Sequence, residues 1–465
     1  QLEKGAQASS FTRLPASTFI QSTSRDNLSE PGTPADLKLL VTAPQPIKGT
    51  LQYTIRNFFG TVVISNMVPF ETKEADVPVA FAIPACDTLP SGSYVIESKV
   101  ELPDGYAHAD WHRFARMKYM NGTHKNKAQF SAANIHALGG DWETVLKLFS
   151  RMGVGSSCIF ETPPKAYQDL LKKYDIFYYP TLFRYSGWPG RILDKYSLGS
   201  SINSSPDAGV GAIQDEDIPL LVNHALETIA MNPDCKAFKT INEPFCQTEA
   251  EIARVAEILK AIRTAAKKIN PSIKIMTPDC ANIDHAMSYL ETFFKHGGAE
   301  ACDIVAVHLY RGHPDGLDED LTKLEGLTDR YKPGAEIWST EGGYFNTYII
   351  PDIGFPVVSH GGDHYRTGNM SYDIGLGERI ATAYQTRYRI QSLKHANRLK
   401  VDQDWNLCSD WRTYFGLEAI PLATVFSVNT LAQLLGNADF VSDLKLPKEL
   451  RGYLFRDEQN RPVVA

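Results

Sequence analysis

Four runs between residues 238 and 341 decide the fold: FKTIN at 238–242, IKIMTP at 273–278, IVAVHLY at 304–310 and EIWSTE at 336–341. Each run is short, apolar and rich in β-branched or aromatic residues, which is typical of a buried strand. Their starts lie about 31 to 35 residues apart, close to one eighth of the roughly 250 residues of a (β/α)₈ barrel.

The segment between the first two runs has the pattern of an amphipathic helix. Thr248 precedes Glu251 by three positions, which is the signature of a capping box, and Pro271 follows the end of the segment. One face collects the apolar residues Val255, Ile258, Leu259, Ile262 and Ile269. Because strands alternate with helices here, the sequence predicts a parallel sheet.

Four further runs bring the number of predicted strands to eight. They are QFSAANI near 129–135, SSCIF at 156–160, IFYYPTLF at 176–183 and RLKVDQDW at 398–405. This number favours a closed barrel over an open doubly wound sheet. We therefore predict an α/β protein whose residues 118–440 form a (β/α)₈ TIM barrel.

The two ends of the chain have different patterns. Residues 1–36 are rich in Ser, Thr, Pro and Gly, which predicts an irregular lead-in, whereas the short alternating runs in residues 37–117 predict a β-sandwich domain. In that domain one face of a strand collects Tyr94, Ile96, Val100 and Leu102. Residues 441–465 predict a short C-terminal β segment. Because a lone hairpin is marginally stable, we expect this segment to join the N-terminal sheet or further strands of a longer polypeptide.

Composition excludes some classes of partner. The 465 residues carry a net charge of −7, and their Lys and Arg are scattered, so we expect no nucleic-acid partner. The apolar stretch 420–435 is too short and too polar to span a bilayer. The seven cysteines lie far apart, so neither a zinc site nor a disulfide framework is predicted, and we expect no cofactor.

The first residue is Gln1 rather than an initiator Met, which suggests that preceding residues were removed. We expect a secreted, periplasmic or cell-surface location rather than a cytoplasmic one.

Two glutamates follow predicted barrel strands. Glu243, in the sequence TINEP, ends the fourth strand, and Glu341, in STEGG, ends the seventh. Their separation in the chain corresponds to three barrel repeats, so both side chains are expected at the C-terminal mouth of the barrel, where barrel active sites lie. Each fragment alone is a weak signal, but a pair of carboxyl groups at one barrel mouth is the arrangement that glycoside hydrolysis requires.

With Asn-Glu-Pro after strand four and Glu after strand seven, the sequence resembles clan A of the glycoside hydrolases over roughly residues 118–435. Within this clan it looks most like the β-xylosidase and α-iduronidase family and its endo-acting relatives. The resemblance implies retaining hydrolysis of an oligo- or polysaccharide, with Glu341 as nucleophile, Glu243 as general acid/base and Asn242 bonded to the sugar 2-hydroxyl. Acting as an acid requires a raised pKa of Glu243, from burial or from the charge of Glu341.

The sequence departs from the clan pattern at one position. Many members place an Arg near the end of strand two to bind the nucleophile, and SSCIFETPP contains none. Either Arg184 or Arg311 substitutes for it, or the strand register differs from the one assigned.

Several other residues are candidates for substrate binding. His308 and Tyr310 share the inward face of the sixth strand, where clan members hold the nucleophile. His136 and Arg184 end strands one and three, Trp188 lies in the long loop after strand three, and Trp405, or else Trp411, follows strand eight. The aromatic rings among them suit stacking on sugar faces, although packing in the core is the common role of such residues.

A barrel that binds sugar without cleaving it is the alternative from a different class of function. Degenerate enzymes usually lose one of the two carboxylates, and this chain has both. Turnover of an aryl glycoside distinguishes the two hypotheses.

Overall fold

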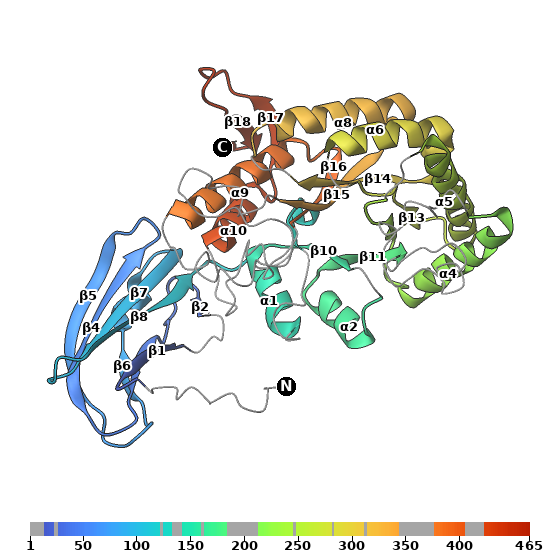
Figure 1. Cartoon of the computed structure of the whole chain (residues 1–465). Helices are drawn as coiled ribbons and strands as arrows, with labels where there is room; N and C mark the ends of the chain where they lie inside the picture. Colours follow the sequence, from blue (N-terminus) through green and yellow to red (C-terminus); the bar gives the residue numbers. More distant parts are fainter. Residues whose placement is uncertain are drawn as a thin grey trace, which may run out of the picture. The chain divides into compact units, whose positions relative to one another are not determined.

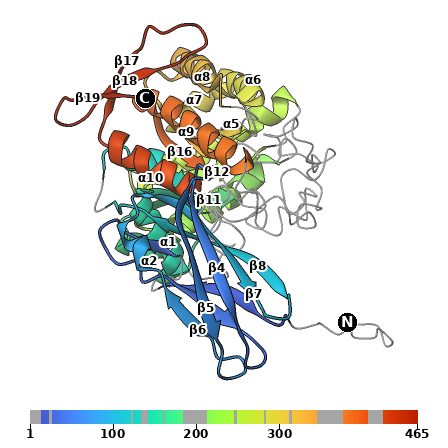
Figure 2. The same cartoon turned by 90° about the vertical axis from the view of Figure 1, so that its left-hand side faces the viewer.

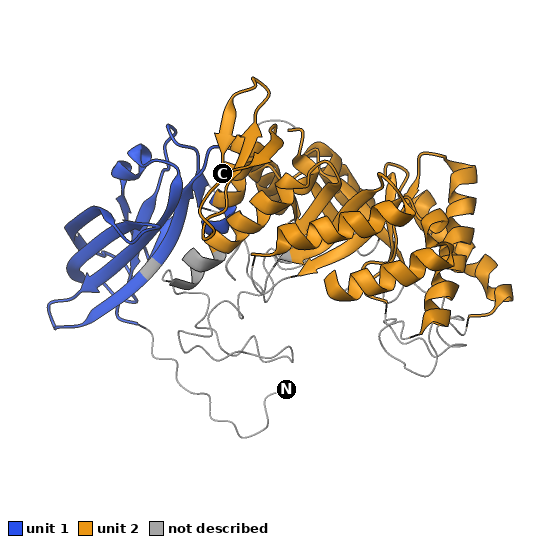
Figure 3. Ribbon diagram, turned by 90° about the horizontal axis from the view of Figure 1, so that it is seen from above, with its two compact units in different colours: residues 1–118, 418–426 blue, residues 119–417, 427–465 orange. Residues whose placement is uncertain are grey.

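The computed structural model describes residues 14–22, 27–120, 124–132, 142–159, 162–183, 213–244, 248–280, 283–310, 314–343, 376–404 and 423–465. The chain divides into two compact units (Figure 3). One comprises residues 1–118 with 418–426, and the other comprises residues 119–417 with 427–465.

The first unit contains two β-sheets. The larger sheet has the order β2 (Leu28–Ser29), β8 (Ala107–Arg116), β7 (Gly92–Glu101), β4 (Lys48–Asn57) and β5 (Val62–Glu71), and its long strands lie side by side in Figure 2. The smaller sheet has the order β1 (Ser17–Gln21), β3 (Lys38–Thr42) and β6 (Val79–Ala82). A 3₁₀ turn, η1 (Pro84–Thr88), follows β6. Apolar side chains of both sheets form one core. The predicted β-sandwich is confirmed, and the residues predicted to share a face of β7, with Leu102 beyond it, all contribute to this core.

Strands β1 and β2 lie inside residues 1–36, for which we expected irregular structure. β1 pairs antiparallel with β3, Ser17 opposite Thr42 and Gln21 opposite Lys38. Its five residues, STFIQ, are too few and too polar to show a period of two. Pairing with an apolar neighbour, which a local pattern does not reveal, makes this segment a strand.

The second unit is built on eight parallel strands in the order β13-β12-β11-β10-β9-β16-β15-β14. Figure 1 labels β10, β11, β13, β14, β15 and β16 of this sheet. Parallel bridges from Met276 to Ile304 and from Cys280 to Val307 join the first and last strands, so the sheet closes. The predicted (β/α)₈ barrel and its eight predicted strands are confirmed. The strands are β9 (Ser131–Ala132), β10 (Ser156–Ile159), β11 (Phe177–Phe183), β12 (Ala237–Ile241), β13 (Lys274–Ile275), β14 (Ile304–Tyr310), β15 (Glu336–Gly343) and β16 (Leu399–Asp404).

Helices connect the barrel strands. They are α1 (Trp142–Met152), α2 (Lys165–Lys173), α4 (Ile218–Met231), α5 (Glu249–Ile269), α6 (Ile283–Phe293), α7 (Ala299–Ala301), α8 (Leu317–Tyr331), α9 (Leu376–Lys394) and α10 (Ala423–Leu435), with the short turns η2 (Lys127–Gln129), η6 (Asp215–Asp217) and η7 (Phe294–Gly298). Within the part of the chain that the structure describes, no helix is long and apolar enough to cross a membrane.

Helix α5 begins as predicted. The Thr248 hydroxyl accepts a hydrogen bond from the Glu251 amide at 3.2 Å, and the Glu251 carboxylate accepts one from the Thr248 amide at 2.8 Å. The apolar stripe is buried from Val255 to Ile262, but Ile269 is 61% exposed because it lies in the last turn, beyond the packed part of the helix.

The C-terminal residues form a sheet of their own. β18 (Tyr453–Arg456) pairs antiparallel with both β17 (Asp439–Asp443) and β19 (Pro462–Val464). The expectation that this segment joins the N-terminal sheet was wrong. Its partner strand is DFVSD, which is mostly polar and exposed and so gave no strand pattern in the sequence. Phe440 of that strand packs against Tyr453 and Phe455.

We expect Phe455→Ala to destabilise this sheet strongly. The Phe455 side chain is 1% exposed, and removing a buried phenyl ring typically lowers the free energy of unfolding by about 3–5 kcal/mol. Val464→Ala, at a position that is 66% exposed on the neighbouring strand, is the matched control and should change it by less than about 0.5 kcal/mol. Urea unfolding of both variants measures the difference. Equal stabilities would show that the small sheet contributes no core.

Candidate active site

The two predicted glutamates meet at the C-terminal end of the barrel. Glu243 follows β12 by two residues, and Glu341 lies near the end of strand β15. A carboxylate oxygen of each and one ring nitrogen of His308 all lie within 4.8 Å of one another. Glu341 is 5% exposed, and Glu243 is only partly buried. The more accessible carboxyl group therefore lies beside a nearly enclosed one.

The backbone of Glu243 has an unusual conformation. Its φ is +46°, in the left-handed region that residues other than glycine rarely adopt, and Pro244 follows it. The Glu243 amide donates a hydrogen bond to the Asp279 carbonyl oxygen at 2.9 Å, which holds this turn. Such a torsion costs about 1–3 kcal/mol and is often found at functional sites.

His308, on β14, joins two carboxylates. Its Nδ1 lies 2.8 Å from Glu243 Oε1, and its Nε2 lies 2.9 Å from Asp279 Oδ2. Ionised carboxylates only accept hydrogen bonds, so each of these contacts requires a proton and the ring is an imidazolium. Burial alone would lower the pKa of His308, but the charges of Glu341 and Asp279 outweigh burial and raise it to about 9.

Tyr310, two residues further along β14, contacts the other glutamate. Its hydroxyl donates to Glu341 Oε2 at 2.9 Å. Burial, together with the charge of Glu341, raises the pKa of Tyr310 well above its ordinary value, so the phenol stays neutral and keeps its proton for this bond. His308 and Tyr310 thus lie on one face of the strand. Tyr310 binds Glu341, and His308 Nδ1 lies 2.8 Å from Glu243 Oε1 and 3.5 Å from Glu341 Oε2.

Sequence reasoning missed two residues of the site, Lys239 on β12 and Asp279 after β13. The Lys239 ammonium lies 3.1 Å from Glu341 Oε1, 2.8 Å from Asp279 Oδ2 and 2.6 Å from Asn242 Oδ1. Both side chains are fully buried. A lysine inside the apolar run FKTIN was the available signal, because lysine is almost never fully buried unless it is paired.

Lys239 and Asp279 each stabilise the charged form of the other. Burial opposes charge on Lys239 and Asp279, but their pairing outweighs it: the pKa of Asp279 falls to about 2, and that of Lys239 rises above its ordinary value. Lys239 therefore provides the cation beside Glu341 for which the sequence offered Arg184 or Arg311. Both arginines lie outside the described residues, as do the candidate binding residues His136, Trp188, Trp405 and Trp411.

The pKa of Glu243 differs from the expectation. We expected a raised value, and burial does act in that direction, but the hydrogen bond from His308 and its positive charge lower the pKa below the ordinary value. The sequence did not indicate that His308 would be protonated, because that depends on Asp279 and Glu341 lying around its ring. The proton of this pair therefore resides on His308.

Glu243, His308 and Glu341 could in principle hold a metal ion, since their ligand atoms lie close together. A metal ligand must, however, be deprotonated, and both ring nitrogens of His308 use their protons to bind carboxylates. The donor set therefore fits a proton-transfer site better than a metal centre.

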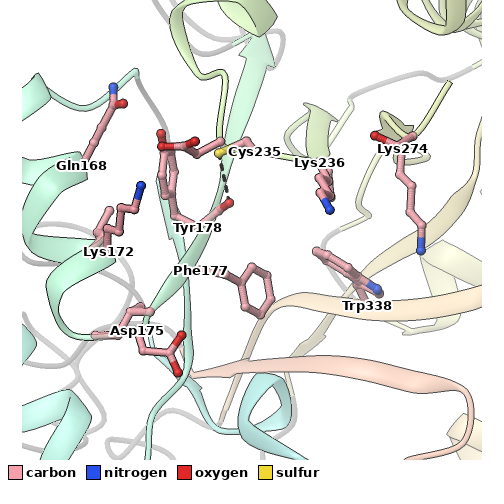
Figure 4. A pocket seen from close by; sticks show the side chains of 14 residues that line it. Gln168, Lys172, Asp175, Phe177, Tyr178, Cys235, Lys236, Lys274 and Trp338 are labelled. Carbon is pink, nitrogen blue, oxygen red and sulfur yellow. Dashed lines mark hydrogen bonds between the residues drawn. The ribbon is translucent and has the colours of Figure 1, made fainter. Parts of the chain in front are cut away.

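A cavity of about 510 Å³ opens at the other end of the barrel, between the starts of β11, β12 and β13 (Figure 4). The rings of Phe177 and Trp338 lie next to each other in it, with centroids 5.9 Å apart. Lys274 is paired with Glu336 at 2.7 Å. The N-terminal end of a barrel serves stability rather than catalysis, so we assign the active site to the glutamate end.

A family model described as "Glycosyl hydrolase catalytic core" matches residues 220–351, which include both glutamates. The match covers less than a third of the chain and supports a glycosidase, without distinguishing between families of these enzymes. No curated protein matches the sequence.

Several solved structures resemble the chain at low sequence identity. A Bacteroides uniformis beta-glucuronidase is 14% identical with a TM-score of 0.39, over 84% of this chain and 45% of that one. A putative beta-galactosidase from Bacteroides fragilis is 11% identical with a TM-score of 0.42, and the match covers 90% of this chain and 62% of that one. A GH2 beta-galacturonidase from Eisenbergiella tayi, bound to galacturonate, is 13% identical with a TM-score of 0.42, and the match covers 86% of this chain and 69% of that one. The chain thus spans about half the length of the B. uniformis enzyme, and similarity at this level does not indicate a substrate.

Proposed function

We propose that the protein is a retaining glycosidase that hydrolyses an oligo- or polysaccharide through a covalent glycosyl-enzyme intermediate. The observation that carries the proposal is that a carboxylate oxygen of Glu243 and one of Glu341 lie within 4.8 Å of each other at the C-terminal ends of two barrel strands. Retaining enzymes hold their carboxyl groups about 5–5.5 Å apart, whereas inverting enzymes leave about 6.5–9.5 Å for a water molecule. The short separation favours direct attack by one carboxylate.

The surroundings of the glutamates suggest which one is the nucleophile. Glu341 is nearly buried and receives hydrogen bonds from Lys239 and Tyr310, which orient its carboxylate. In the first step a Glu341 oxygen attacks the anomeric carbon, the bond to the leaving oxygen breaks, and an ester to the sugar forms.

Glu243 is the more accessible carboxyl group and takes the acid/base role. Its proton is supplied along the 2.8 Å hydrogen bond to His308, which loses the proton from Nδ1 and stays bonded to Asp279 through Nε2. Glu243 passes this proton to the leaving oxygen. In the second step Glu243 removes a proton from water, the hydroxide attacks the anomeric carbon, and Glu341 is released.

Turnover of a panel of 4-nitrophenyl α- and β-glycosides tests the proposal, followed by proton NMR of the first sugar anomer released from the best substrate. We expect hydrolysis of at least one member, with retention of the anomeric configuration. Initial release of the inverted anomer would overturn the retaining mechanism. Saturable binding of a glycan without hydrolysis of any panel member would favour the sugar-binding barrel instead.

A further inference from the structure

Lys239 contacts three residues that lie at the ends of the barrel strands β12, β13 and β15. Its Nζ lies 2.6 Å from Asn242 Oδ1, 2.8 Å from Asp279 Oδ2 and 3.1 Å from Glu341 Oε1. An ammonium group has three N–H donors and no acceptor. These three oxygens suit its donors, and the Lys239 side chain is fully enclosed.

The bond to Asn242 fixes which way its amide points. The oxygen and nitrogen of an amide are interchanged by a half-turn, and the hydrogen-bond network decides between the two orientations. Lys239 can only donate, so the amide atom at 2.6 Å must be the oxygen, Oδ1. The NH₂ group of Asn242 is then directed away from Lys239, and no residue within the described part of the chain accepts a hydrogen bond from it.

We propose that Lys239 is a positioning residue that holds the Glu341 carboxylate for attack and sets the Asn242 amide so that it offers hydrogen-bond donors to a sugar hydroxyl. The inference rests on the proposed glycosidase function and deepens it. One buried cation thereby links the group that attacks the anomeric carbon to the group that recognises the hydroxyl beside it. The sugar oxygen bonded by Asn242 must act as an acceptor.

Two of the residues that Lys239 contacts keep other hydrogen bonds when the lysine is replaced, so its role can be tested by substitution. Asp279 Oδ2 also accepts hydrogen bonds from His308 Nε2 at 2.9 Å and from the Thr340 hydroxyl at 2.6 Å. Glu341 keeps its bond from Tyr310. Methionine has nearly the length of lysine and fills the same space without the charge.

The experiment compares an aryl glycoside that the wild-type protein hydrolyses with its 2-deoxy counterpart, in the wild type, Lys239→Met, Asn242→Ala and the double variant. The ratio of kcat/KM for the two substrates measures recognition of the 2-hydroxyl. We expect Lys239→Met to lower kcat roughly 100-fold and to reduce the preference for the 2-hydroxyl substrate roughly tenfold. The preference should fall to that of Asn242→Ala, and the double variant should show no further loss of it.

Tyr310→Phe is the matched control, because it removes a bond to Glu341 but leaves Asn242 untouched. It should lower kcat with an unchanged preference for the 2-hydroxyl substrate. An unchanged preference in Lys239→Met, or a kcat within about threefold of the wild type, would overturn the inference while the glycosidase function stands.

Lys239→Gln provides a second measurement if the Met variant does not fold, as judged by circular dichroism. Collapse of both variants would show that Lys239 is required for folding, and would overturn its assignment as a positioning residue. Absence of wild-type turnover on every substrate would overturn both the function and this inference.

Discussion

Glu341→Gln is expected to lower kcat on the order of 10⁴-fold or more, because an amide cannot form the ester to the anomeric carbon. The side chain keeps its size, so the free energy of unfolding should change far less than activity does. Steady-state kinetics measures the loss. Intact-mass spectrometry with a 2-deoxy-2-fluoro glycoside, which slows the second step, should show a covalent adduct on the wild type and none on the variant.

Glu336→Gln is the matched control for this substitution. It makes the same change at the other end of the same strand, where Glu336 forms a partly exposed ion pair with Lys274. Its kcat should stay within about threefold of the wild type, since exposed ion pairs contribute little. A folded Glu341→Gln variant that retains wild-type activity, or that still forms the adduct, would remove Glu341 from the mechanism.

Glu243→Ala should have an effect that depends on the leaving group. An alkyl or unactivated aryl glycoside needs a proton on its leaving oxygen, so the variant should lose about 10²–10⁴-fold in kcat/KM. With a 2,4-dinitrophenyl glycoside the bond breaks without protonation, and kcat/KM should remain close to that of the wild type. Added azide should then raise kcat by attacking the glycosyl-enzyme, and the product should be a glycosyl azide of retained configuration.

Glu249→Ala, at an exposed position at the start of α5, provides the comparison for a glutamate outside the site. It should respond neither to the leaving group nor to azide. If Glu243→Ala lost the same factor with both substrates and gave no azide product, Glu243 would not be the acid/base.

The barrel could be predicted from the sequence because most residues of its strands are buried. Runs such as IVAVHLY need no knowledge of their neighbours to be recognised, and their regular spacing fixes the repeat. Strands β1 and β17 escaped prediction because they are short, partly polar and made into strands by their pairing. The expectation that the C-terminal segment joins the N-terminal sheet was wrong for the same reason, since DFVSD has no apolar period.

The electrostatics of the site could not be predicted from local pattern. Lys239 contacts Asp279 and Glu341, which are 40 and 102 residues away in the chain, and only closure of the barrel brings them together. The direction of the pKa shift of Glu243 was wrong because it depends on the charge of His308, which in turn depends on Asp279 and Glu341. Motifs can thus indicate where reactive groups lie, while their protonation follows from the three-dimensional neighbourhood.

Selection for heat resistance alone would favour replacing Glu243 by another residue. The φ of +46° at Glu243 is a conformation that glycine or asparagine adopts at lower cost than glutamate does. Replacing the carboxyl side chain there would relieve part of a torsional cost of about 1–3 kcal/mol, and would remove the proposed acid/base at the same time. Thermal stability and catalysis therefore favour different residues at position 243. Substitutions meant to raise the thermal stability of the protein should be made at other positions.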